Sequence, residues 1–272
     1  MTPRRKEPIM ASLDLRRILA GWNYEANQIT VRKITGDDGT VKVQMRLDLG
    51  LLQMEVTGRP DGTRPHGCDS LLEYHEKQLE AHTEKNGTEL GFELSPADCQ
   101  ALREESLQYY HRYLAEFVLE DFEGVERDTA RNVRVIDLCH DHAREESDRT
   151  ALEQYRPYLI MMNTRAQVHL ALRRGSFKTA MARVSAGLTQ IQELLTETGQ
   201  EDMFEELTEV TILTALRNEI AARLPADPLA KLESELSKAV DEERYEDAAV
   251  LRNRMEAMKA RHVGSSVRRR KK

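Results

Sequence analysis

The sequence is poor in cysteine and aromatic residues, and it has no long apolar run. Its three cysteines, Cys68, Cys99 and Cys139, are widely spaced and form no Cys-x-x-Cys pair. This is typical of reduced thiols in a cytosol rather than of a disulfide framework. Aromatic residues make up 5% of the chain, whereas charged residues make up 32%. That balance favours a helix-rich, water-exposed protein over a β-sandwich or a membrane protein.

Membrane and secretion signals are missing from the sequence. No apolar stretch approaches the roughly 20 residues that a transmembrane helix needs. The basic residues Arg4 to Lys6 are followed by only two apolar residues, which is too short for the core of a secretory signal. We therefore expect a cytoplasmic protein with no membrane partner. The net charge of −7 argues against a nucleic-acid surface over the whole chain.

The first third of the chain predicts an arm and a small sheet. Residues 1–26 are expected to form an arm with one short helix, in which the lone Trp22 either anchors the arm on the body or contacts a partner. Residues 27–94 are expected to form a β-meander followed by one helix. Apolar and polar residues alternate strictly over Val41–Leu49, after a Gly-rich turn, and Leu51–Val56 is the candidate third strand.

Residues 95–225 predict an antiparallel helical array. Ser95-Pro96-x-Asp98 has the features of a helix start, namely a capping hydroxyl, a first-turn proline and an acid. A second helix is expected to begin near Asp128. A third is expected over Thr150–Arg174, where Pro157 either kinks the helix or marks its true start. Two further helices follow, over 177–198 and 202–223.

Part of this array resembles one tetratricopeptide repeat. In the segment Met161–Leu195, Gly175-x-Phe177-x-x-Ala180 forms the turn between two apolar helices. The resemblance implies a peptide-binding cleft between stacked helix pairs. A generic helical bundle is the alternative, because no clean 34-residue copies occur elsewhere in the chain.

Residues 226–262 predict two short amphipathic helices joined by a polar turn at Asp241–Arg244. The apolar residues of each helix step by three and four, and small alanines would let the backbones approach closely. Such a hairpin buries too little surface to be stable alone. It must pack on the rest of the chain, on a second copy or on a partner.

This hairpin resembles the UVR motif of the excision-repair proteins UvrB and UvrC, which also occurs in adaptors of Clp-type proteases. The run Leu232-x-x-Glu235-Leu236-x-x-Ala239 and the run Tyr245-Glu246-x-Ala248-Ala249-x-Leu251-Arg252 carry the resemblance. It implies a protein-docking hairpin without catalysis of its own. The docking residues expected from it are Leu232, Glu235, Leu236, Ala239, Glu243, Tyr245, Ala248, Ala249, Leu251, Arg252 and Met255.

Other chemistry is weakly indicated. In the loop Gly58–Gly67, Arg59, Arg64 and His66 are candidates to hold an anion, although a turn-rich connector with its arginines in water is the more common outcome. The basic residues of 263–272 predict a disordered tail, or a weak and salt-sensitive attraction to nucleic acid or an acidic partner.

No catalytic, cofactor or metal motif stands out. Cys139-His140-Asp141-His142 is the best metal-like cluster, but it offers two ligands on one helical face and has no evident second pair. We expect a buried thiol with surface histidines there. The acidic pairs Glu104-Glu105 and Glu205-Glu206 are expected to be solvated helix faces.

The sequence thus predicts a mainly α interaction protein that is not an enzyme and has no cofactor. It would dock as an adaptor onto a UVR-bearing repair protein, a Clp ATPase or a second copy of itself. The alternatives are a Clp-protease adaptor and a repair accessory whose basic tail contacts nucleic acid.

Overall fold

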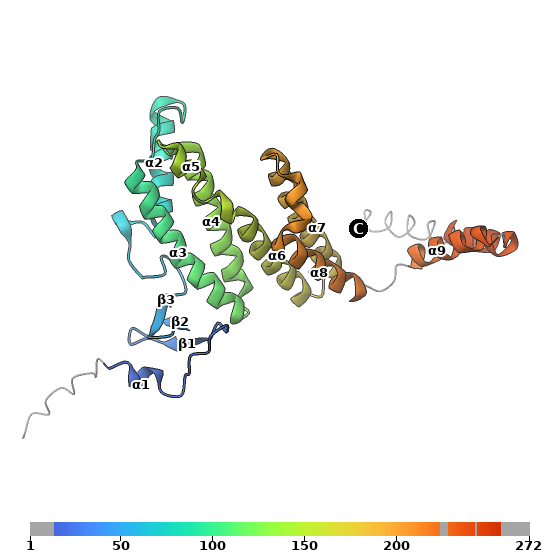
Figure 1. Cartoon of the computed structure of the whole chain (residues 1–272), viewed down its shortest axis with the longest axis horizontal. Coiled ribbons are helices and arrows are strands. Elements are labelled where there is room, and N and C mark those ends of the chain that lie inside the picture. Colours follow the sequence, from blue (N-terminus) through green and yellow to red (C-terminus); the bar gives the residue numbers. More distant parts are fainter. Residues whose placement is uncertain (1–13, 224–227, 243, 257–272) are drawn as a thin grey trace, which may run out of the picture. The chain divides into compact units, whose positions relative to one another are not determined.

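Helices predominate in the computed structural model, which describes residues 14–223, 228–242 and 244–256 (Figure 1). A small antiparallel sheet lies near the N-terminus, which confirms the expected mainly α fold with an N-terminal meander. The chain divides into two compact units, Met1–Arg217 and Asn218–Lys272. Among the described residues, no helix combines the length and the apolar character needed to span a membrane.

The elements are, in chain order, α1 (Arg16–Leu19), β1 (Val31–Thr35), β2 (Val41–Arg46), β3 (Leu51–Glu55), the 3₁₀ turn η1 (Pro65–Gly67), α2 (Leu71–Asn86), α3 (Pro96–Val118), α4 (Phe122–His142), α5 (Glu146–Thr150), η2 (Glu153–Tyr155), α6 (Arg156–Arg173), α7 (Phe177–Glu197), η3 (Glu201–Glu206), α8 (Thr208–Arg223) and α9 (Pro228–Asp241). Residues 245–256 form a further helix.

The sheet is a meander in the order β1-β2-β3. Its buried face includes Val43 and Met45 of β2, which pack in one cluster with Ala115 of α3. The strand predicted up to Leu49 is three residues too long, because β2 ends at Arg46. The next residues form the tight turn to β3, in which the amide of Leu47 donates to the carbonyl of Gly50 at 2.9 Å.

Trp22 ties the described part of the arm to the sheet. The guanidinium of Arg32 lies over the Trp22 ring, 4.0 Å from its centroid, and Arg46 donates to the Trp22 carbonyl at 3.0 Å. Arg32 also donates to the carbonyl of Ile18 at 3.1 Å. The arm is therefore held by cation–π stacking and backbone-directed hydrogen bonds. Residues 1–13 of the predicted arm lie outside the described residues.

Two helices begin at serine caps, and the cap at Ser95 is the one that the sequence predicted. The Ser70 hydroxyl accepts from the amide of Glu73 and starts α2, which ends at Gly87 in the left-handed conformation, with φ of 75°. A complete capping box between Ser95 and Asp98 starts α3, with Pro96 in the first turn. Each cap satisfies amides that the first turn leaves without intrahelical partners.

The second predicted helix begins earlier than its sequence pattern indicated. α4 starts at Phe122 rather than near Asp128, because Asp121 caps it by accepting from the amide of Gly124 at 3.4 Å. The preceding residue, Glu120, has a φ of 57°, so α3 turns sharply into α4. Asp128 is consequently an interior residue of α4.

The bounds of the later helices agree only in part with those predicted from the sequence. α6 begins at Arg156 with Pro157 in its first turn, so the proline marks a start and not a kink. The single helix predicted over 202–223 is wrong, because the extended residue Leu207 separates η3 from α8.

The paired helices α6 and α7 approach each other closely at one point. A Cβ atom added to Gly187 of α7 would overlap the side chain of Thr164 of α6. Only glycine therefore allows this packing of the pair without a shift of Thr164. The likeness of this pair to a tetratricopeptide repeat stays a prediction.

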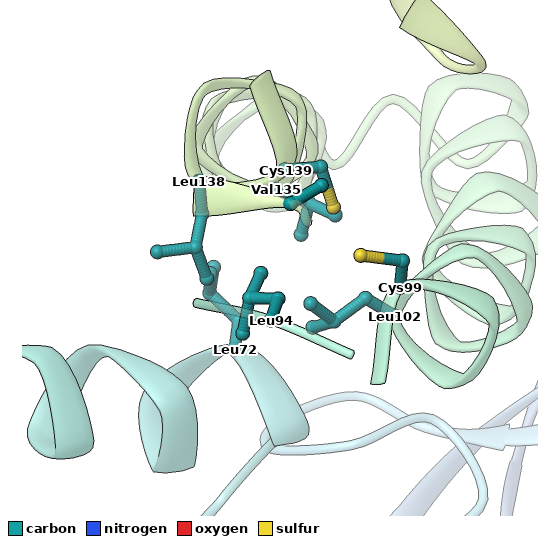
Figure 2. Packing of buried hydrophobic residues seen from close by; sticks show 8 residues of the cluster. Leu72, Leu94, Cys99, Leu102, Val135, Leu138 and Cys139 are labelled. Atoms are coloured by element: carbon teal, nitrogen blue, oxygen red, sulfur yellow. The ribbon is translucent and has the colours of Figure 1, made fainter. Parts of the chain in front are cut away.

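One apolar core joins α2, α3, α4 and the segment before α3 (Figure 2). Leu94 connects that segment to the end of α4, because its amide donates to the carbonyl of His142 at 2.8 Å and its carbonyl accepts from Arg144 at 3.1 Å. The buried members of the core are Leu72, Leu94, Cys99, Leu102, Val135, Leu138, Cys139 and Ala143.

Candidate functional site

The C-terminal helical hairpin consists of α9 (Pro228–Asp241), a short turn and the helix over residues 245–256. The amide of Arg244 donates to the carbonyl of Ala239 at 2.7 Å, which reverses the chain direction. The Arg244 guanidinium pairs with Glu242 at 2.8 Å and with Asp247 at 3.0 Å. These ion pairs are exposed, so they orient the turn more than they stabilise it.

The inner face of the hairpin is made of small and aliphatic side chains. Among the hairpin side chains that the structure describes, Ala239 and Ala248 are the most deeply buried, at 1% and 6% exposure. Their helical neighbours at spacings of three and seven residues are half-buried. These neighbours are Leu232, Leu236, Leu251 and Met255. The two apolar rows predicted for docking are thus already partly covered by the protein itself.

The remaining predicted docking residues are exposed, and they include one large aromatic side chain. Tyr245 is 67% exposed, and Ala249 lies one helical turn after it, also exposed. On α9, Val240 is exposed one turn after Leu236. Glu235 and Arg252 are exposed, whereas Glu243 lies outside the described residues. Val240 was not among the predicted docking residues, although its spacing from Leu236 was a usable signal.

A family model described as UVR, the UvrB/uvrC motif, matches residues 227–261. The chain carries a UVR motif. The match covers the hairpin and a small part of the 272 residues. No curated protein and no solved structure matches the chain significantly. The UVR motif is a protein-interaction module that is known in repair and adaptor proteins, which is consistent with a docking role.

Arg59, the first candidate anion ligand outside the UVR motif, is directed into the protein. Its guanidinium pairs with Asp61 at 2.7 Å and with Glu105 of α3 at 3.0 Å, and it also donates to the Thr63 hydroxyl at 2.5 Å. A bound anion would therefore compete with two carboxylates for the same guanidinium.

The other two candidates have separate partners. Arg64 pairs with Asp69 at 2.9 Å, and the His66 ring stacks on Tyr74 with 4.0 Å between the ring centroids. The structure gives each of the three side chains a protein partner of its own. The anion site at this loop stays a prediction.

Behind the loop lie two largely buried ion-pair networks that the sequence did not indicate. The first joins Arg59, Glu105 and Arg131, and the second joins Arg112, Glu116, Arg127 and Asp128. Glu105 is completely buried, so the expectation of a solvated Glu104-Glu105 face is wrong for Glu105. Its carboxylate accepts from Arg131 and from the amide of Leu71, the first residue of α2, at 2.8 Å. A carboxylate at a helix N-terminus is stabilised by the helix dipole and by the unpaired amides there.

Arg112 connects the network that contains Asp128 to the sheet. It donates to both carboxylate oxygens of Asp128, at 2.6 and 2.9 Å. Its third donor group binds the carbonyls of Glu55 and Gly58, at 3.0 and 2.8 Å. The Tyr109 ring lies against the guanidinium groups of both Arg112 and Arg131. One arginine thereby fixes α3, α4 and the end of β3 together.

Glu116 of the second network has a strongly perturbed carboxyl group. Burial, and then the neighbouring charge of Asp128, raises the pKa of Glu116 to about 8. Arg127, which pairs with Glu116 at 2.8 Å, opposes this shift. A Cβ atom on Gly124 would overlap the Glu116 carboxylate, so glycine at this position makes room for the acid.

The sequence cluster at Cys139–His142 does not come together as a metal site. Cys139 is buried in the apolar core, whereas the His140 ring is exposed and lies 3.2 Å from Glu153. Within the described ranges, no group of three or more His, Cys, Asp or Glu side chains is placed to hold a metal ion.

Proposed function

We propose that this protein is a non-catalytic, cytoplasmic adaptor that docks a partner protein through its UVR hairpin. The observation that carries the proposal is the UVR motif at 227–261, folded as a helical hairpin with an exposed tyrosine beside a covered seam. An exposed aromatic side chain flanked by smaller apolar groups is the usual form of an interface anchor.

The docking surface in this proposal is the exposed row of the hairpin that includes Val240 and Tyr245. The covered row around Ala239 and Ala248 is not part of it. Tyr245 and Val240 would enter the partner's apolar surface, with Leu236 contributing the part of its side chain that stays exposed. Glu235, Arg252 and Arg254 are exposed charges at the rim, where they would select the partner and set the association rate more than the affinity.

The partner proposed first is a UVR-bearing protein of nucleotide excision repair, since this hairpin type occurs in repair proteins. The zinc-binding Cys-x-x-Cys pairs expected beside the hairpin of McsA-type protease adaptors are missing from the sequence. A Clp ATPase is therefore the second candidate. Direct capture of nucleic acid by the basic tail is the third, and residues 263–272 lie outside the described residues.

A titration of the full chain with purified repair protein, Clp ATPase and duplex DNA tests the proposal. Tyr245→Ala should weaken binding to the true protein partner by about tenfold or more, as loss of a buried interface aromatic does. Asn253→Ala, an exposed polar change on the same helix, is the matched control and should leave affinity unchanged. Equal binding by both variants, or binding to DNA alone, would overturn docking through the hairpin.

A further inference from the structure

Two of the three thiols meet in the apolar core. Cys99 lies near the N-terminus of α3 and Cys139 in the last turn of α4, and they are 0% and 1% exposed. Figure 2 shows their sulfur atoms directed toward the space between the two helices. Each thiol lies close enough to the other to influence its pKa. The other buried members of this cluster are aliphatic, and the charges of Arg103 and Asp148 also act on both thiols.

We infer that Cys99 and Cys139 form a dithiol pair that a hydroperoxide can join in an intramolecular disulfide. The bond would link the start of α3 to the end of α4. Cys68 is excluded from the pair by its place, because it precedes α2 and its sulfur lies 3.8 Å from the Lys77 ammonium. The pair is independent of the hairpin and of the proposed docking.

The chemistry balances with the hydroperoxide as the oxidant. One thiolate attacks the terminal peroxide oxygen, the O–O bond breaks, and a sulfenic acid forms with release of the alcohol, or of water when the oxidant is hydrogen peroxide. The second thiol attacks that sulfur, and the sulfenic oxygen leaves as water. Two thiols and one peroxide therefore give one disulfide, with two electrons passing from sulfur to oxygen.

The surroundings make this reaction slow in the closed protein. Burial raises the pKa of both thiols, that of Cys139 to about 12, so little thiolate is present at neutral pH. Their burial also keeps a polar oxidant away from the sulfur atoms. Oxidation therefore requires local opening where α3 and α4 meet, and the pair responds to sustained peroxide and not to brief exposure.

The test treats the full-length Cys68→Ser variant with hydrogen peroxide and then analyses peptides by mass spectrometry without reduction. The expected product is one disulfide-linked peptide pair containing Cys99 and Cys139. Its mass is that of the two reduced peptides less two hydrogens, and dithiothreitol separates it into them. Adding Cys99→Ser should abolish it, and urea below the unfolding transition should accelerate its formation. The oxidised protein should melt at a higher temperature than the reduced protein, because the bond restricts the unfolded chain.

A second measurement uses the wild type, in case the serine variants fail to fold. After oxidation and quenching, denatured protein is alkylated with N-ethylmaleimide. Labelling of Cys68 alone, in protein that remains monomeric, supports the pair. Labelling of all three thiols, sulfonic acids at Cys99 and Cys139, or disulfides whose yield rises with protein concentration would overturn it.

Discussion

Arg112 of α3 binds both carboxylate oxygens of Asp128 of α4, and each of the two side chains is 1% exposed. The same guanidinium binds the backbone at the end of β3. Three elements, α3, α4 and β3, therefore share one buried charge. Buried ion pairs cost much desolvation energy to form, so their main effect is to penalise any arrangement that separates the partners.

Breaking this pair should destabilise the protein strongly. We expect Arg112→Met to lower the free energy of unfolding by about 3–5 kcal/mol, since it leaves the Asp128 carboxylate buried without its main partner. The control is Arg134→Met, which removes an exposed ion pair with Glu76 and should cost less than about 1 kcal/mol. Urea denaturation of both variants measures the difference. Equal losses would contradict a special role of the buried pair.

Glu116 should make stability depend on pH. Its pKa in the folded protein is about 8, against an ordinary value of 4.5. Between these values the folded state holds a proton that the unfolded state has released, so stability from this group falls as pH rises. Glu116→Gln cannot titrate, so the stability gained by this variant over the wild type should increase from pH 5 to pH 8. Parallel stability curves of the two proteins, measured by urea denaturation, would refute the shift.

Replacing Gly187 should destabilise the protein, because the side chain of Thr164 leaves no room for a Cβ atom. Alanine normally stabilises a helix relative to glycine by about 0.5–1 kcal/mol, but here its methyl group would overlap Thr164. We expect Gly187→Ala to destabilise the protein by about 1–3 kcal/mol, as overpacking does. In a Thr164→Ala background the same change should cost clearly less, which a double-mutant cycle measures. Additive effects would show that the two helices do not meet at these residues.

Neighbouring alanines of the UVR hairpin should respond in opposite ways to the same substitution. Ala248 is buried and Ala249 is exposed. Ala248→Glu should expose both hairpin helices to exchange, lowering the protection of their amides by about tenfold or more, because it buries an unpaired charge. Ala249→Glu should leave protection unchanged. Hydrogen exchange over residues 228–256 measures this protection. Equal protection in both variants would contradict the prediction.

The features that the sequence predicted are those with local signals. The cap at Ser95 acts within one helical turn, Pro157 restricts its own backbone, and the meander follows the alternation of its own strands. The hairpin was recognisable because its pattern is contained in one continuous stretch, residues 227–261.

The features that the sequence did not predict depend on distant partners. The sequence indicates a solvated Glu105, because its partners, Arg131 and the start of α2, are far from it in the sequence. The early start of α4 is an exception, because its cap at Asp121 is local and Asp128 is a competing capping residue in the sequence. In the candidate site, the division between a covered seam and an exposed row depends on how the two helices face each other, which spacing alone leaves open.

Glu105 also has a kinetic consequence. The residue supplies part of the N-terminal cap of α2 from a position 34 residues later in the chain, on the helix that pairs with α4. A nascent α2 therefore has the cap from the Ser70 hydroxyl, but it lacks the cap from the Glu105 carboxylate until α3 is formed and docked. We expect the α3–α4 pair, which is closed by a short connection, to form first during folding, and α2 and the meander to consolidate on it afterwards. Variants at Glu105 should then slow the late step, and stopped-flow refolding would separate it from the early one.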